Sequence, residues 1–186
     1  MADREQAFPR TAVLTALGLA VLLAVGVVIA AQVSGGDENA APPSPTQKPP
    51  RTGPLPVVPV PAPAADSPDC ASLLPALPAV VVSNGEQWPR LPLAEPAPRA
   101  TAAWGTPTGD PAILRCGLDR PAELTPTSAL REVNGVRWLP VSREDATTFW
   151  AVDRAVFVVL TVPPTAGTGV LQDVSTALGR ALPPRR

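Results

Sequence analysis

An uncharged apolar run near the N-terminus restricts this chain more than any other feature. The run TAVLTALGLAVLLAVGVVIAAQV begins at Thr11, ends at Val33 and contains 23 residues. As an α-helix it would be about 35 Å long, enough to cross a hydrocarbon core of about 30 Å. It has no polar face, which disfavours a helix of a soluble domain. We therefore expect residues 11–33 to form a transmembrane helix in contact with the lipid bilayer.

The charges beside this run predict its orientation. Arg4 and Arg10 precede it, whereas Asp37 and Glu38 follow it. The positive-inside rule then places residues 1–10 in the cytoplasm and the rest of the chain outside the plasma membrane. A cleaved signal peptide is the alternative, because the residues VIAA at 28–31 loosely fit a small-residue cleavage site. The run is longer than the usual apolar region of about 7 to 15 residues, which favours an uncleaved signal-anchor.

Residues 34–68 are rich in proline and alanine. Of the 27 residues from 42 to 68, 11 are proline, which removes backbone donors and disfavours helix and central strand. This composition is typical of a disordered, semi-rigid spacer between the membrane and a folded domain. A proline-rich ligand for a partner protein, for example at residues 42–45, is the alternative.

The sequence from residue 69 to residue 183 predicts one small extracytoplasmic domain. Asp69 is a candidate helix N-cap, because Leu73, Leu74 and Leu77 follow it at helical spacing. Residues 80–82 are consistent with a short strand, but the rest of the stretch up to residue 110 predicts loop. Residues 112–118 predict a strand.

Two hairpins and a second helix complete the predicted domain. Asn134-Gly135 between β-prone flanks is typical of a two-residue turn in which both positions have positive φ. Strands at 147–152 and 155–162 flank Asp153-Arg154, and the later strand is apolar on both faces, as in a central strand. Helical spacing from Leu171 to Leu182 predicts the last helix. The fold class is therefore α+β, with a mostly antiparallel sheet and a helix at each end.

Composition excludes several kinds of site. The chain has no histidine, so it has no imidazole for a Ser-His or Cys-His pair or for a zinc site. Its formal net charge is −1, which gives no basic surface for nucleic acid. No phosphate-binding glycine motif and no metal-binding spacing of carboxylates occurs. We expect no catalytic residue, no metal and no cofactor.

Cys70 and Cys116 are the only cysteines and both follow the apolar run. In an oxidising compartment two such thiols are most simply a disulfide. Closing a loop of about 46 residues would stabilise the fold by about 4 kcal/mol on the chain-entropy model. A redox pair is the alternative, but it would favour CxxC spacing, which is absent.

Arg115 lies beside Cys116 in the predicted strand 112–118. Alternation places Leu114, Cys116 and Leu118 on one face and Arg115 on the other. Arg115 either pairs with a nearby carboxylate, Asp110 or Asp119, or lies beside Trp104 and presents its guanidinium to a carboxylate or phosphate ligand. We retain Trp104 and Arg115 as a candidate ligand surface.

Short motifs follow one another in the predicted domain: WG at 104–105, LRCG at 114–117, LTPTS at 124–128, VNGV at 133–136 with Trp138, RAV at 154–156 and VP at 162–163. This order resembles a family of small actinobacterial membrane-anchored proteins, domain of unknown function 3515, over about residues 69–182. Residues 106–111 are a few residues longer than in that pattern. The abundance of Ala, Pro and Arg, with a single lysine, also indicates an actinobacterial source. The resemblance implies a single-pass envelope protein of unknown activity and brings no catalytic residues.

Three functions are consistent with these features. The first is a non-enzymatic module that binds another envelope protein or a cell-wall component. The second is a cell-wall hydrolase that uses two carboxylates as acid and base; its candidates, by residue type alone, are Glu86, Glu95, Asp110, Glu123, Glu132, Glu144 and Asp145. The third is a structural accessory subunit of a membrane complex. We expect the first.

Overall fold

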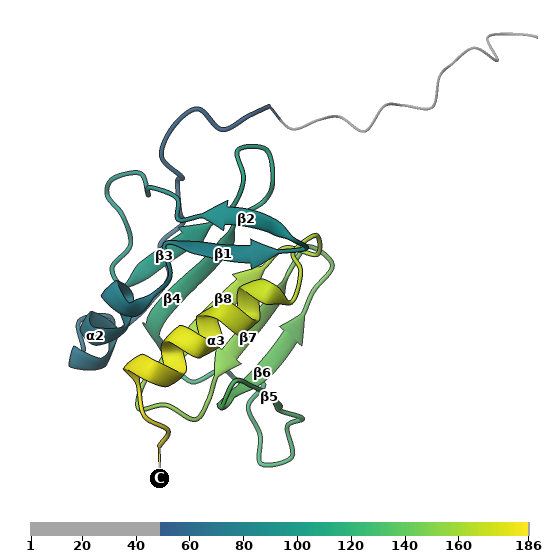
Figure 1. Ribbon diagram of the computed structural model, residues 1–186. Helices are drawn as coiled ribbons and strands as arrows, with labels where there is room; N and C mark the ends of the chain where they lie inside the picture. The colour runs from purple at the N-terminus through teal and green to yellow at the C-terminus, as the bar shows by residue number, and fades with distance from the viewer. Residues whose placement is uncertain (1–48, 186) are drawn as a thin grey trace, which may run out of the picture. The chain divides into compact units, whose positions relative to one another are not determined.

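The computed structural model describes residues 49–185 (Figure 1). The chain divides into two units, residues 1–47 and 48–186, and the described residues all belong to the second unit. The predicted cytoplasmic tail, the predicted transmembrane helix and the linker before residue 49 lie outside the described residues. Between residues 49 and 185, none of the helices has the length and apolar character needed to span a membrane.

Residues 49–185 contain two helices and eight strands. In chain order they are α2 (Pro68–Ala76), β1 (Val80–Ser83), β2 (Glu86–Pro89), β3 (Thr101–Trp104), β4 (Ala112–Leu118), β5 (Arg131–Val133), β6 (Val136–Ser142), β7 (Thr147–Ala151), β8 (Phe157–Val162) and α3 (Gly169–Ala181). Strands β1 and β2 form a small antiparallel sheet. The other six form an antiparallel sheet in the order β3-β4-β8-β7-β6-β5. The prediction of a small α+β domain with antiparallel sheets and two helices is confirmed.

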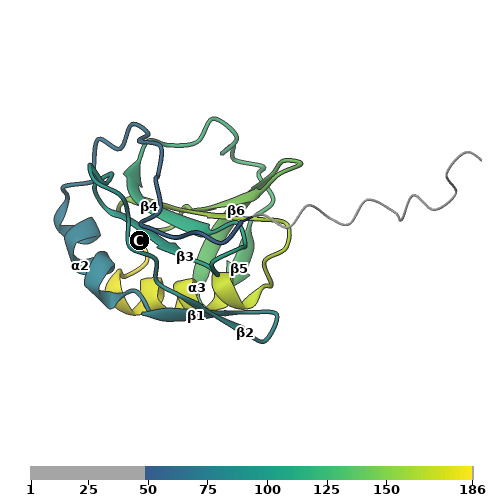
Figure 2. The ribbon, with the colours of Figure 1, turned by 90° about the horizontal axis from the view of Figure 1, so that it is seen from above.

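The two helices and the β1–β2 hairpin lie on the same face of the six-stranded sheet (Figures 1 and 2). The core fills the space between these layers, because each contributes its apolar side to one cluster. Its members include Leu73 of α2, Val81 and Trp88 of the small sheet, Leu114, Trp138 and Leu160 of the large sheet, and Val174 and Leu178 of α3. Strand β8 lies inside the large sheet, between β4 and β7. Its predicted central position is therefore confirmed.

Both two-residue hairpins of the domain use the same dipeptide. The predicted turn at Asn134-Gly135 joins β5 to β6, with φ of 48° and 75° at the two residues. Asn84-Gly85 joins β1 to β2 with φ of 51° and 81°. This second hairpin lies in the stretch that we expected to be mostly loop, and β3 follows in the same stretch. The Asn-Gly signal is present there, but its flanking strands have only four residues each.

Two local expectations are wrong. The N-cap of α2 is Ser67 rather than Asp69: Ser67 Oγ accepts a hydrogen bond from the Cys70 backbone N–H at 3.3 Å, and Pro68 occupies the first turn. Leu118 does not share the face of Leu114 and Cys116. The register shifts between Cys116 and Leu118 because Gly117, with φ of 88°, forms a bulge.

Part of the predicted linker lies against the domain. Leu55 is only 7% exposed; its backbone N–H donates to the Pro92 carbonyl, and its own carbonyl accepts from the Ala94 N–H. The Ala64 N–H donates to the Gly117 carbonyl at 3.0 Å. We call residues 51–66 the strap. The described domain thus begins before residue 69, inside the segment that composition assigns to a disordered linker.

Candidate functional site

Arg115 lies in β4 on the face of the sheet that points away from α2 and α3. Leu114 and Cys116, its neighbours in the strand, both point into the core. Its Nη2 donates to the Val58 carbonyl of the strap at 3.3 Å, and its buried Nε has no hydrogen-bond partner. Burial lowers the pKa of the Arg115 guanidinium below its usual range, because desolvation disfavours the charged form.

Among residues 49–185, no carboxylate forms an ion pair with Arg115. The ion pairs among the described residues join Arg99 to Asp66, and Arg137 and Arg154 to Asp153. The expected pairing of Arg115 with Asp110 or Asp119 is therefore wrong. The strap takes the place of such a partner and offers only a neutral carbonyl oxygen.

Trp104 is not part of the surface around Arg115. Its side chain is 0% exposed within the core cluster, and its Nε1 donates to the Pro78 carbonyl at 2.9 Å. In the β3–β4 register Trp104 pairs with Ala112, whereas Arg115 pairs with Thr101. The two side chains therefore lie on opposite faces of the sheet. The structure does not bring together the two residues of the candidate ligand surface.

A hollow of about 300 Å³ lies beside Arg115. One wall is the strap, with Pro59, Val60, Ala62, Ala65 and Asp66. The other side is formed by Pro98, Arg99, Thr101 and Arg115. Sequence reasoning misses the strap as a site element because its composition alone predicts a spacer, and nothing local signals that it folds back over β4.

The Arg99–Asp66 ion pair lies at the rim of this hollow, and both side chains are mostly exposed. Both residues also line a second hollow of about 300 Å³, which adjoins Cys70 and Leu74 of α2. The ion pair thus stands between two adjoining hollows. Thr101 Oγ1 donates to the Arg99 carbonyl at 3.0 Å and ties the backbone there to β3.

The β3–β4 loop, residues 105–111, holds the start of the strap. The Arg51 guanidinium donates from Nη1 to the Thr106 carbonyl and from Nη2 to the Gly109 carbonyl, both at 3.1 Å. The Arg51 backbone N–H also donates to the Pro107 carbonyl at 2.7 Å. The loop therefore anchors the strap through its carbonyl groups.

The predicted disulfide joins Cys70 of α2 to Cys116 of β4. Both residues are buried. The bond fastens α2, which follows the strap, directly to the strand that carries Arg115. Gly117 is next to it: a side chain there would collide with the Ala64 backbone, because an added Cβ would lie 2.3 Å from the Ala64 carbonyl carbon.

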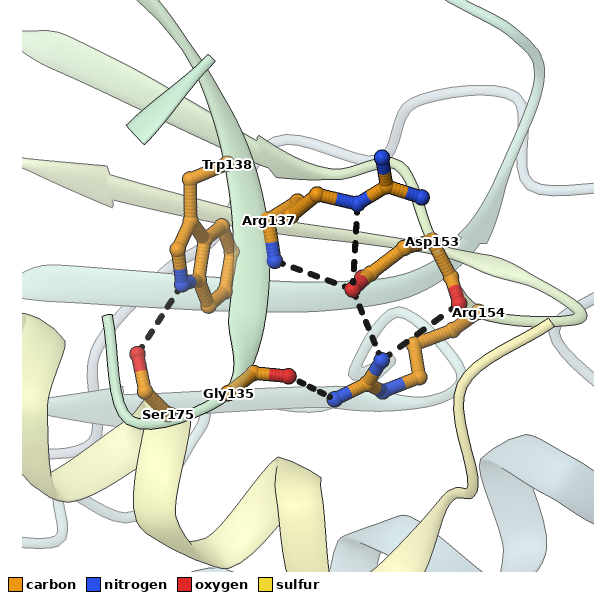
Figure 3. Close-up of polar contacts among 6 residues, drawn as sticks. All are labelled: Gly135, Arg137, Trp138, Asp153, Arg154 and Ser175. Atoms are coloured by element: carbon orange, nitrogen blue, oxygen red, sulfur yellow. Dashed lines mark hydrogen bonds and ion pairs between the residues drawn. The ribbon is translucent and has the colours of Figure 1, made fainter. Parts of the chain in front are cut away.

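A second polar cluster lies at the β7–β8 connection (Figure 3). Asp153 is 5% exposed and Arg154 is 2% exposed. Asp153 Oδ2 accepts from Arg154 Nη1 at 2.9 Å and from the Arg137 backbone N–H at 3.1 Å. Arg154 Nη2 donates to the Gly135 carbonyl at 2.9 Å. The pair therefore ties the β7–β8 connection to the Asn134-Gly135 hairpin.

The sequence pattern indicates only a turn at this buried pair. Asp153 Oδ1 and Arg154 Nε are buried without a hydrogen-bond partner. The Asp153 carbonyl also accepts from the Arg185 backbone N–H at 2.7 Å, which fastens the C-terminal segment. The available sequence signal is the RAV motif at 154–156, which places a charged residue three positions before the apolar strand β8.

The carboxylates that a hydrolase would need lie on separate segments. Glu86 is in β2, where it accepts from Trp88 Nε1, and Glu132 is in β5. The others lie in loops: Glu95, Asp110, Glu123, and the neighbours Glu144 and Asp145 in the β6–β7 turn. Within residues 49–185 no group of three or more Asp, Glu or Cys side chains could hold a metal ion.

Comparison with known proteins gives one result. A family model described as a protein of unknown function, DUF3515, matches residues 17–186. No curated protein and no solved structure matches the chain.

Proposed function

This chain belongs to the DUF3515 family of proteins of unknown function, and we propose that it is a single-pass cell-envelope protein with a non-enzymatic binding domain outside the plasma membrane. The N-terminus is cytoplasmic, the apolar run 11–33 is the anchor, and the described domain binds another envelope protein or a cell-wall component. An actinobacterial source, inferred from composition, is part of the same proposal.

The hollow beside Arg115 is the observation that carries the binding role. It offers a fixed guanidinium with spare donors, and an arginine side chain cannot act as a base in a protein. Its one carboxylate, Asp66, is bound to Arg99. This set of groups is suited to holding a ligand rather than to moving protons.

The buried disulfide supports the extracytoplasmic location. Disulfides persist in oxidising compartments and are rare in the cytosol. Cys70 and Cys116 follow the apolar run in the sequence, so an outward orientation places both in the oxidising compartment. The charges at Arg4 and Arg10 favour the same orientation.

The two other candidate functions make different predictions. A carboxylate-dependent hydrolase requires turnover of a wall polymer by the purified protein, lost when one carboxylate is removed. A structural accessory subunit acting through residues 11–33 requires loss of function when that segment is replaced by an unrelated apolar helix. The function of a binding module would be retained after that replacement.

Labelling of added cysteines tests the location. In the otherwise native chain, Ser34→Cys and Ala2→Cys are compared in intact cells of the source organism with a membrane-impermeant maleimide. We expect Ser34→Cys to react before lysis and Ala2→Cys only after lysis. The reverse pattern would overturn the proposed orientation. A mass spectrum of the mature protein shows whether residue 2 is retained and so decides between anchor and cleaved signal.

Crosslinking tests the binding role. A photoreactive amino acid is placed at Val60 in the wall of the hollow, and at Leu130 as a control; the two residues are 41% and 36% exposed. We expect a crosslink to an envelope protein or a wall fragment from Val60 and none from Leu130. Absence of any crosslink from Val60 would count against binding at this site.

A further inference from the structure

The hollow beside Arg115 has an unbalanced positive charge. Three charged residues line it, Arg99, Arg115 and Asp66, so its net charge is +1. The Asp66 carboxylate is bound to Arg99, which leaves the charge of Arg115 without a partner among the described residues. A partly buried charge that is not compensated disfavours the folded state, and a bound anion would remove this cost.

Arg115 keeps donors for such an anion. A guanidinium has five N–H groups. One donates to the Val58 carbonyl, and the N–H of Nε is enclosed without a partner. Three therefore remain on Nη1 and Nη2, enough for a bidentate contact with a planar carboxylate.

We propose that this hollow binds the carboxylate of a small aliphatic ligand, held by Arg115 with its apolar part against the strap. The inference deepens the proposed function, on which it rests, by naming the class of ligand at the same site. The apolar part would contact Pro59, Val60, Ala62 and Pro98.

The charge and size of the hollow favour a monocarboxylate over a phosphate. The net charge of +1 balances one negative charge, and the Asp66 carboxylate at the rim repels a dianion. The wall formed by proline, valine and alanine offers apolar surface rather than further donors. A volume of about 300 Å³ lies at the lower end of the range for ligand sites, which suits a small ligand.

This carboxylate has two chemical sources, a free short-chain acid and the C-terminus of a peptide with small side chains. Both present the same planar anion and a short aliphatic body. The peptide adds backbone N–H groups, for which the exposed Asp66 carboxylate and the Thr101 hydroxyl oxygen are acceptors at the same hollow.

Binding is tested with the full-length chain in detergent micelles, by following the arginine Nε–H signals in NMR spectra. The probes are sodium butyrate, N-acetyl-alanyl-alanine, the C-terminal amide of that dipeptide, and inorganic phosphate. We expect a saturable shift of the Arg115 signal with butyrate or the free dipeptide acid and none with the amide. The ratio of the two affinities identifies the source. No shift with either acid, or equal binding of phosphate or of the amide, would overturn the proposal.

Two variants test whether the Arg115 guanidinium itself binds the carboxylate. Arg115→Lys keeps the charge but loses the fork, so affinity for the carboxylate should fall at least about tenfold, as expected for loss of one charge-assisted hydrogen bond. Arg131→Lys, at an exposed position of β5, is the matched control and should bind as the native chain does. Unchanged affinity of Arg115→Lys would contradict the proposal. If Arg115→Lys folds poorly, the titrations of the native chain with the two acids, the amide and phosphate still decide the test.

The outcomes separate this inference from the proposed function. Crosslinking of an envelope partner at Val60 without any carboxylate binding would support the proposed envelope module and overturn the proposed carboxylate site. Carboxylate binding in micelles together with inverted labelling in cells would support the carboxylate site and overturn the proposed extracytoplasmic location.

Discussion

Asp153 and Arg154 are charged residues that this small domain buries almost completely. Removing charge from water is costly, and the cost is offset only when the charges are paired and hydrogen-bonded. Here Asp153 Oδ2 forms an ion pair with Arg154 Nη1, and the Gly135 carbonyl accepts a hydrogen bond from Arg154 Nη2. The pair therefore links the β7–β8 connection to the Asn134-Gly135 hairpin, and each buried charge is compensated by the other.

We expect Asp153→Asn to lower the free energy of unfolding by about 3 to 5 kcal/mol, because it leaves Arg154 as an uncompensated buried charge. Urea unfolding of the purified chain measures this difference. The control is Arg137→Gln, whose exposed side chain reaches Asp153 only at 3.8 Å, and which should cost less than about 1 kcal/mol.

A double variant checks the mechanism. Asp153→Asn combined with Arg154→Met removes both charges, so it should be less destabilised than the sum of the single variants. Strict additivity of the two changes would show that the pair does not act as a unit.

Strand β4 is the element on which the strap, the disulfide and the hollow converge. Its bulge at Gly117 needs a residue without a side chain for two reasons, the positive φ and the Ala64 backbone that an added Cβ would meet at 2.3 Å. Gly135 has a positive φ as well, but open space around it. A substitution at Gly135 therefore measures the cost of the positive φ alone, whereas a substitution at Gly117 adds the collision with the strap.

We expect Gly117→Ala to destabilise the chain by about 1 to 3 kcal/mol more than Gly135→Ala. Both variants bear the cost of a left-handed conformation, about 1 to 2 kcal/mol, and only the first displaces the strap. Thermal and urea unfolding of the two variants give the comparison. Equal losses would mean that the strap does not press on Gly117 in solution.

Elements with a strong local signal are predictable from the sequence. The Asn134-Gly135 turn, the strand 112–118 and helix α3 follow from residues close together in the chain. The β1–β2 hairpin escapes prediction although it has the same dipeptide, because its strands are short and β2 ends at Pro89. The predicted N-cap of α2 is wrong by two residues, since Ser67 and Asp69 are both good capping residues.

The candidate site is only partly predictable, because its geometry depends on contacts distant in sequence. The place of Arg115 beside Cys116 identifies it as a candidate. Its neighbour Val58 is separated from it by 57 positions, and proline-rich composition does not indicate which surface a segment covers. Closeness in the chain suggests that Trp104 lies beside Arg115, whereas strand pairing directs the two side chains to opposite faces.

At the scale of the whole molecule, the strap decides where the folded domain begins. A chain that starts at Pro49 should be more stable than one that starts at Ser67, by at least about 2 kcal/mol, because the shorter chain loses the buried Leu55 side chain. Denaturant unfolding of the two truncated chains measures the difference. Equal stability would support the assignment of residues 51–66 to a spacer.

The order of fastenings along the chain has a mechanical consequence. A pulling force applied at the N-terminal side reaches the domain first at Arg51 and Leu55, then at Ala64, and only afterwards at Cys70, where a covalent bond transfers it to β4. Hydrogen bonds and apolar contacts yield at such a load, whereas the disulfide prevents residues 70–116 from being extended. Tension on a tether would therefore peel the strap away from Arg115 before it loads β4, and the hollow, one wall of which is the strap, would exist only while the tether is slack.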